Sequence, residues 1–162
     1  MIFQLTNELS FPHPSLANES GLLAIGGDLS TERLLLAYAN GIFPWYSEGE
    51  PICWYAPNPR CVLYPKNIII SKSMQKVIKD RSFTVTTNQA FADVIGNCKN
   101  KERPGKDGTW ITDDMKNAYI ELHKKGYAES LEVWQKNKLV GGLYGIKMGE
   151  IFCGESMFSL ES

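Results

Sequence analysis

The stretch LVGGLYGIKMGEIFCGESMFSLES, residues 139–162, decides the fold class of this chain. Two apolar runs are separated by a short turn around Gly149, a pattern that predicts a pair of antiparallel strands. Glycine recurs inside both runs, at positions 141, 142, 145 and 154. Glycine within a strand marks either a β-bulge or a close approach of a ligand to the backbone. The sequence leaves both interpretations open.

The residues before this stretch extend the sheet and add helices. The segment AESLEVWQ, residues 128–135, ends in a turn at Lys136-Asn137 and predicts the first strand of a three-stranded meander. Helices followed by a meander favour an α+β domain whose sheet is covered on at least one side. The expected helices are residues 71–80, 88–98 and 110–126, the last with Thr112 as its N-cap, and the expected additional strands are residues 60–65 and 83–87.

The first 59 residues have a different character. Proline and glycine are dense on both sides of one predicted helix, STERLLLAYAN, in which Ser30 can cap the N-terminus and Asn40-Gly41 can end the helix. The rest of this region predicts little regular structure, yet it holds many large apolar residues. We therefore expect a small irregular N-terminal domain over residues 1–59, packed against a larger domain over residues 60–162.

Composition excludes several classes of protein. The 162 residues are 43% hydrophobic and 22% charged, which is typical of a globular chain. Apolar runs are too short for a membrane span and no signal pattern is present, so we expect a cytoplasmic protein without a membrane partner. Four cysteines without a C-x-x-C pair predict reduced, buried thiols, and two distant histidines offer no metal-ligand spacing. His123, beside two lysines, predicts a solvated surface position.

Charge is distributed unevenly although the net charge is only −1. Residues 66–106 carry nine basic and three acidic side chains, whereas the segments on either side are acidic. A basic middle segment is typical of a surface that binds a polyanion. A solvated lysine-rich helix and loop would give the same pattern, so charge alone does not decide.

Aromatic residues and one carboxylate are the remaining candidates for chemistry. Trp45 and Trp110 lie beside loops, where an indole can act as a platform for a base, although packing in a core is the commoner role of tryptophan. Glu155 follows Gly154 and precedes an apolar run, so burial could raise its pKa, or it could bind a cation. A trough with a glycine floor and Glu155 at its rim would suit an apolar guest attached to a positive group. Its expected apolar walls are Leu143, Phe152, Met157 and Phe158.

Four motifs in register resemble one known family. The segments GLLAIGGDLSTERLLLAYANGIFPW, GTWIT, LVGGLYGI and FCGESMFS are closely similar to the bacterial leucyl/phenylalanyl-tRNA–protein transferases. The resemblance implies a small N-terminal domain followed by an acyltransferase domain of the GNAT type, with a mixed, largely antiparallel sheet. It also implies transfer of Leu or Phe from aminoacyl-tRNA to the N-terminal Arg or Lys of an acceptor protein, which marks that protein for N-end rule degradation. No metal or other cofactor is expected.

The same resemblance implies roles for individual residues. Trp45 and Trp110 would flank the terminal adenosine of the tRNA, and Leu143 and Phe152 would line the pocket for the Leu or Phe side chain. Glu155 would be the catalytic residue that meets the basic N-terminus of the acceptor. Met157 and Ser159 would belong to the edge of the same site, and Lys72, Lys76 and Lys79 would hold the tRNA.

The family continues beyond the last matching motif, so the chain resembles the front two-thirds of such an enzyme. We therefore expect an incomplete GNAT-like domain and, if the rest is absent, inactivity. Two other functions stay open. An acetyl-CoA-dependent acyltransferase of the same fold would need a glycine loop that cradles pyrophosphate and leads into a helix. A non-catalytic fragment that binds tRNA or peptide would need neither that loop nor a catalytic group.

Overall fold

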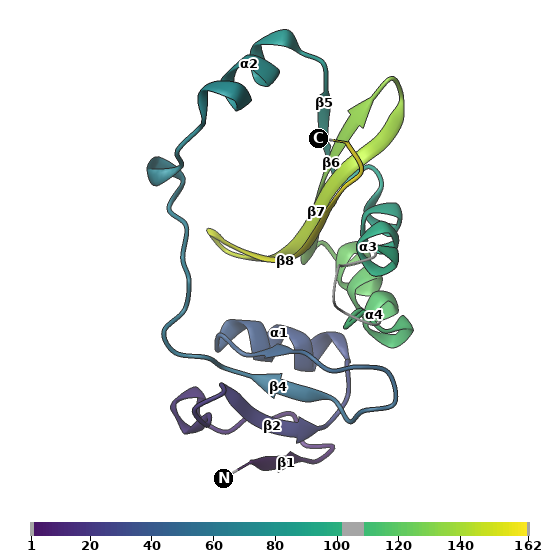
Figure 1. Cartoon of the computed structure of the whole chain (residues 1–162). Helices are drawn as coiled ribbons and strands as arrows, with labels where there is room; N and C mark the ends of the chain where they lie inside the picture. Colours follow the sequence, from purple (N-terminus) through teal and green to yellow (C-terminus); the bar gives the residue numbers. More distant parts are fainter. Residues whose placement is uncertain (1, 102–108, 162) are drawn as a thin grey trace.

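The computed structural model describes residues 2–101 and 109–161, which form an α+β structure with two four-stranded sheets (Figure 1). The N-terminal sheet has the order β1-β2-β4-β3, and the second sheet has the order β5-β6-β7-β8. The α+β class predicted from the sequence is confirmed. The strands of the N-terminal sheet are β1 (Phe3–Leu5), β2 (Leu22–Gly26), β3 (Phe43–Pro44) and β4 (Cys53–Tyr55).

The N-terminal region is more regular than its sequence predicted. Strand β1 pairs parallel with β2, and β4 pairs antiparallel with both β2 and β3. These strands are two to five residues long, too short to show the alternation of polar and apolar residues that identifies a strand. The expectation of an irregular region was therefore wrong in this respect. Helix α1 (Thr31–Ala39) has the predicted caps, since the Ser30 hydroxyl accepts from the N–H of Arg33 and Asn40 follows the last turn.

The second sheet contains the predicted three-stranded antiparallel meander, extended by a fourth strand. Its strands are β5 (Thr84–Thr87), β6 (Ala128–Gln135), β7 (Lys138–Met148) and β8 (Ile151–Ser159). Helices α3 (Phe91–Asn100) and α4 (Asp113–Lys124) cover one face of this sheet (Figure 1). Alternate residues of β7, including Tyr144 and Ile146, are fully buried with these helices. Thr112 caps α4 as expected, because its hydroxyl accepts from the N–H of Met115 at 3.1 Å.

The segment between the two sheets departs from the prediction. Residues 60–65 form no strand, because none of the strands in the described part of the chain pairs with them. All residues from 58 to 82 are exposed, and this segment arches away from the rest of the chain before it returns to β5 (Figure 1). It contains a short 3₁₀ turn, η2 (Pro65–Asn67), and the predicted helix α2 (Lys72–Asp80), which has no buried residue. We call residues 58–71 the connecting segment.

Two expectations about single residues need correction. His123 is half-buried rather than solvated: its ring stacks on Phe91 with centroids 4.3 Å apart, and its Nδ1 lies 2.8 Å from the carbonyl oxygen of Ala128. The four cysteines are free, but only Cys98 is fully buried, and Cys61 is exposed because it lies in the connecting segment. No helix in the described part of the chain is long and apolar enough to span a membrane.

Candidate functional site

A pocket of about 340 Å³ lies where the N-terminal sheet faces β8 of the second sheet. A pocket of this size is typical of sites for small ligands. Its walls come from the end of β3, from the connecting segment, from a residue two positions before the Thr112 cap of α4 and from β8. The lining residues are Phe43, Pro44, Trp45, Arg60, Trp110, Gly154 and Glu155.

Trp45 and Trp110 both border this pocket, although 64 positions separate them in the sequence. Trp45 directly follows β3, and its N–H donates to the carbonyl oxygen of Cys53 at 2.8 Å. Its side chain is 49% exposed, with its ring 5.6 Å from that of Tyr55. Trp110 is half-buried at the edge of the core. Neither indole is sealed in a core, so both can offer a face to a ligand.

Arg60 is a pocket residue that the sequence analysis did not identify. Its guanidinium carbon lies 4.8 Å from the centroid of the Phe43 ring, which itself stacks on Tyr55. A planar guanidinium over an aromatic face is a favourable cation–π arrangement. The only signal in the sequence was a single arginine in a segment predicted as a strand, and the side chain of that residue was therefore assigned no partner.

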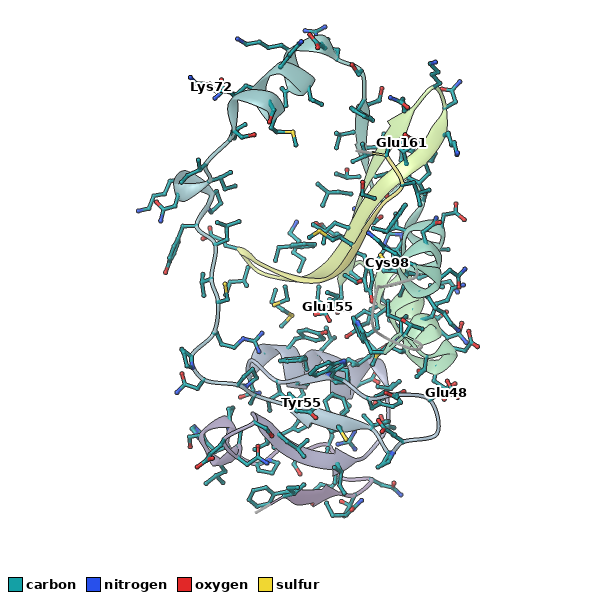
Figure 2. All side chains as sticks on the ribbon, viewed as in Figure 1. Glu48, Tyr55, Lys72, Cys98, Glu155 and Glu161 are labelled. Atoms are coloured by element: carbon teal, nitrogen blue, oxygen red, sulfur yellow. The ribbon has the colours of Figure 1, made fainter. Side chains whose placement is uncertain are left out.

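Glu155 owes its position to a β-bulge. Tyr144 pairs with Ser156 and Gly145 pairs with Gly154, so Glu155 is the extra residue between them. A bulge bends the strand and re-aims a side chain, and here the carboxylate borders the pocket. Figure 2 shows Glu155 below β8, between the second sheet and the N-terminal part of the chain.

The glycines of β7 serve this bulge and the core, not a ligand. A Cβ at Gly145 would lie 2.2 Å from the carbonyl oxygen of Cys153 and 2.6 Å from Cζ of Phe152. A Cβ at Gly142 would lie 2.8 Å from Cε1 of Phe158 and 2.9 Å from Cγ2 of Val94. The space beside these glycines is therefore filled by the protein itself. The bulge is therefore confirmed and an open trough is wrong at Gly142 and Gly145, whereas Gly154 of β8 borders the pocket.

Burial gives the Glu155 carboxyl an unusual pKa. Removal from water raises the pKa to about 7, and a hydrogen bond from Tyr38 and the positive charge of Arg60 act in the opposite direction. The Tyr38 hydroxyl is itself bonded to the Tyr119 hydroxyl, and burial raises the pKa of both phenols well above the ordinary value. Near neutral pH the carboxyl can therefore hold or release a proton, whereas the phenols stay protonated.

Comparison with known proteins agrees with this architecture. Residues 62–162 match the family model for leucyl/phenylalanyl-tRNA protein transferase, and residues 27–58 match the model for the N-terminal domain of that transferase. The chain belongs to this transferase family. It is 57% identical over 158 residues to the leucyl/phenylalanyl-tRNA–protein transferase of Flavobacterium johnsoniae, covering 98% of this chain and 74% of that protein. It is 52% identical to the protein of the same name from Anaeromyxobacter sp., covering 98% of this chain and 67% of that protein.

Leu143 and Phe152, which we expected to contact the side chain of the transferred amino acid, lie beside the pocket and are not among its lining residues. A Cβ at Gly154 would lie 3.7 Å from Cδ1 of Leu143 and 3.8 Å from Cε1 of Phe152, so both side chains adjoin the pocket at Gly154. Met157 pairs with Leu143 across the strands and is 65% exposed. Ser159 lies at the end of β8, where its hydroxyl donates to the carbonyl oxygen of Glu161 at 2.6 Å.

The expected tRNA-binding lysines are not near the pocket. Lys72, Lys76 and Lys79 are exposed on α2, and Figure 2 shows Lys72 near the top of the view, well away from Glu155 near the centre. The three lysines therefore belong to a surface that is separate from the pocket. Within the described ranges, no group of three histidine, cysteine or acidic residues could hold a metal ion.

Proposed function

We propose that this pocket binds the aminoacyl-adenosine end of a charged tRNA, and that the enzyme transfers Leu or Phe to the N-terminal Arg or Lys of an acceptor protein. The observation that carries the proposal is the convergence of Trp45, Trp110 and Glu155 on one cavity. Two indoles at the walls suit an adenine base, because stacking on an aromatic ring contributes roughly 1–3 kcal/mol per base. The transferase names of the relatives support the same substrate.

In this proposal the reaction is the attack of an amine on an ester. The nitrogen of the acceptor's α-amine bonds to the ester carbonyl carbon, the bond from that carbon to the ribose oxygen breaks, and a proton passes from nitrogen to that oxygen. An α-amine has a pKa of about 7.7–8.0, so part of it is already neutral near pH 7. Glu155, with a pKa of about 7, would attract the basic end of the acceptor and could carry the transferred proton. Correct placement of the two reactants supplies the rest of the catalysis.

We assign the side chain of the transferred amino acid to the apolar surface beside Gly154. Leu143 and Phe152 meet there, next to the expected position of the ester. Selection by such a surface is soft, since one methylene changes binding by roughly 1–3 kcal/mol. Leu and Phe would therefore both be accepted, with small side chains disfavoured. Residues 1–59 and 60–162 would act as two domains that each supply one wall of the site.

An acetyl-CoA-dependent reaction is the less favoured alternative. A pyrophosphate site needs a glycine loop that opens a helix with free N–H groups. Helices α1, α2 and α4 begin instead with Ser30, Ser71 and Thr112, whose side chains already accept from the first turn. The Gly26-Gly27 turn before α1 is followed by Asp28, whose carboxylate pairs with Arg33 and would repel a phosphate.

Binding of a stable analogue tests the proposal directly. Leucyl-adenosine with an amide in place of the ester should quench tryptophan fluorescence on titration. Trp45→Ala and Trp110→Ala should each weaken binding by tenfold or more, with little change in the free energy of unfolding for Trp45→Ala because that side chain is half exposed. Trp134→Phe is the matched control, since Trp134 lies on β6 and donates to Thr86 outside the pocket.

Transfer and RNA binding complete the test. Radiolabelled leucyl-tRNA should pass leucine to a peptide that starts with Arg, but not to one that starts with Asp. tRNA binding should weaken as salt rises, because phosphate contacts release counterions. An analogue that binds equally well to the Trp45, Trp110 and Trp134 variants would contradict the proposed site.

A further inference from the structure

Among the described residues that line the pocket, Arg60 is the one that carries a positive charge. It lies at the start of the exposed connecting segment, and Glu155 is an acidic residue that lines the same pocket. None of the ion pairs between described residues includes Arg60. Its positive charge therefore borders the pocket without a carboxylate bound to it.

The contact with Phe43 holds the Arg60 guanidinium in place beside the pocket. Its carbon lies 4.8 Å above the ring, and that ring stacks in turn on Tyr55, with centroids 6.2 Å apart. A guanidinium that packs over an aromatic ring still has N–H groups with which to donate hydrogen bonds. A fork of N–H donors held on an aromatic support is suited to bidentate binding of a tetrahedral or planar anion.

The ligand proposed above carries such an anion next to its adenosine. In tRNA the terminal adenosine is joined through its 5′ oxygen to a phosphodiester, whereas the amino acid is attached at the opposite side of the ribose. We propose that Arg60 binds this 5′-phosphodiester, so that the pocket selects aminoacyl-adenosine that is part of a nucleic acid over the free aminoacyl nucleoside. This inference rests on the proposed function. It makes Arg60 a specificity-determining residue for the donor substrate.

Another role for Arg60 would give a different result. Its charge also acts on the carboxyl of Glu155 and on the thiol of Cys153, lowering the pKa of each relative to burial alone. If this electrostatic effect were its only function, loss of Arg60 would change the binding of every ligand that contacts Glu155. If Arg60 binds the phosphate, its loss weakens the binding of ligands that carry the phosphate more than that of ligands without it.

Three stable amide analogues separate these roles: leucyl-adenosine, its 5′-monophosphate, and the cytidylyl-(3′→5′) derivative. Tryptophan fluorescence titrations at pH 6 and pH 8 give the three dissociation constants. We expect the wild-type chain to bind both phosphate-bearing analogues roughly tenfold more tightly than the nucleoside, as for a charge-assisted hydrogen-bonded pair. Arg60→Gln should abolish this preference by weakening the binding of the phosphate-bearing analogues more than that of the nucleoside, and Arg60→Lys should keep part of it.

Lys66→Gln is the matched control, because Lys66 is an exposed residue of the same connecting segment and does not line the pocket. It should keep the full preference for phosphate. An equal loss of affinity for all three analogues in Arg60→Gln would overturn the inference. Tighter binding by the wild-type chain of the cytidylyl derivative alone would also overturn it, because the added affinity would then come from the cytidine and not from the phosphate. Wild-type binding of the nucleoside without any preference would overturn it while leaving the proposed function intact. Absence of binding of all three analogues would overturn the proposed function, and this inference with it.

Discussion

The hydroxyl of Tyr38 in α1 hydrogen-bonds the hydroxyl of Tyr119 in α4, which joins the N-terminal part of the chain to the helices that cover the second sheet. Both phenols are buried, and Tyr38 is also a hydrogen-bond partner of Glu155. The carboxylate of the pocket is therefore held by the contact between the two parts. Packing between the parts and chemistry in the pocket depend on the same three side chains.

Tyr119→Phe should lower the free energy of unfolding by about 1–2 kcal/mol, because it removes one buried hydrogen bond and keeps the ring packed against Tyr144. Urea unfolding at pH 7 measures this difference. Tyr127→Phe is the control, since Tyr127 is 41% exposed and its variant should match the wild type. An unchanged unfolding midpoint in Tyr119→Phe would show that the pair contributes nothing to stability.

Glu155 should make the chain less stable as pH rises. Its pKa of about 7 in the folded state lies above the ordinary value of 4.5, so the folded state binds the proton more strongly than the unfolded state does. Stability is therefore full below pH 4.5 and falls as pH rises to about 7. Glu155→Gln lacks this loss and should be more stable than the wild type at pH 8, by on the order of 3 kcal/mol, with no such gain at pH 4.

Urea unfolding of both proteins from pH 4 to pH 9 measures the effect. Glu150→Gln, in the exposed turn between β7 and β8, controls for the loss of one negative charge and should follow the wild-type curve. A constant difference between Glu155→Gln and the wild type at all pH values would rule out a titration of Glu155 as the cause.

Local sequence signals predicted the second sheet and its helices, because those elements are long and their caps are ordinary. Ser30 and Thr112 each cap the helix that the sequence assigned to them. The N-terminal sheet was missed since its strands are only two to five residues long. Residues 60–65 have the composition of a strand, yet a strand needs a partner, and pairing is a property of the tertiary structure.

The candidate site was predictable only in part. Their sequence context drew attention to Trp45, Trp110 and Glu155, the resemblance to a family implied their roles, and the structure places all three at one pocket. Nothing local identified Arg60, because its role depends on a ring of Phe43 that lies 17 positions earlier. The bulge that positions Glu155 was an open alternative, since a glycine pattern alone does not say what fills the space beside it.

Glu132 should affect stability with the opposite dependence on pH. Burial alone would raise its pKa, but hydrogen bonds from the hydroxyls of Ser130 and Thr86, each 2.5 Å long, and from the N–H of Ala90 outweigh burial and lower it. The stability from this carboxylate is present above its ordinary pKa and is lost as pH falls through the lowered value. Glu132→Gln should therefore cost about 1–3 kcal/mol at pH 7 and progressively less below pH 4.

The measurement is urea unfolding between pH 3 and pH 7. Glu129→Gln is the matched control on the same strand, because Glu129 forms a partly exposed pair with Lys147 and should contribute less than about 1 kcal/mol. An equal loss of stability in the two variants at pH 7 would show that the hydrogen bonds of Glu132 contribute no more to folding than the partly exposed ion pair of Glu129.

Three glycine substitutions should separate the effect of the bulge on ligand binding from the effect of side-chain packing on stability. Gly145→Ala places a Cβ 2.2 Å from a backbone oxygen, so β8 must shift, and we expect a loss of more than about 3 kcal/mol together with loss of analogue binding. Gly142→Ala meets only side chains and should cost about 1–3 kcal/mol while binding persists. Gly96→Ala, in α3 with its nearest neighbour at 3.7 Å, should stabilise the chain by about 0.5–1 kcal/mol. Urea unfolding and fluorescence titration measure the two effects, and full analogue affinity in a folded Gly145→Ala variant would show that the bulge does not position Glu155 for binding.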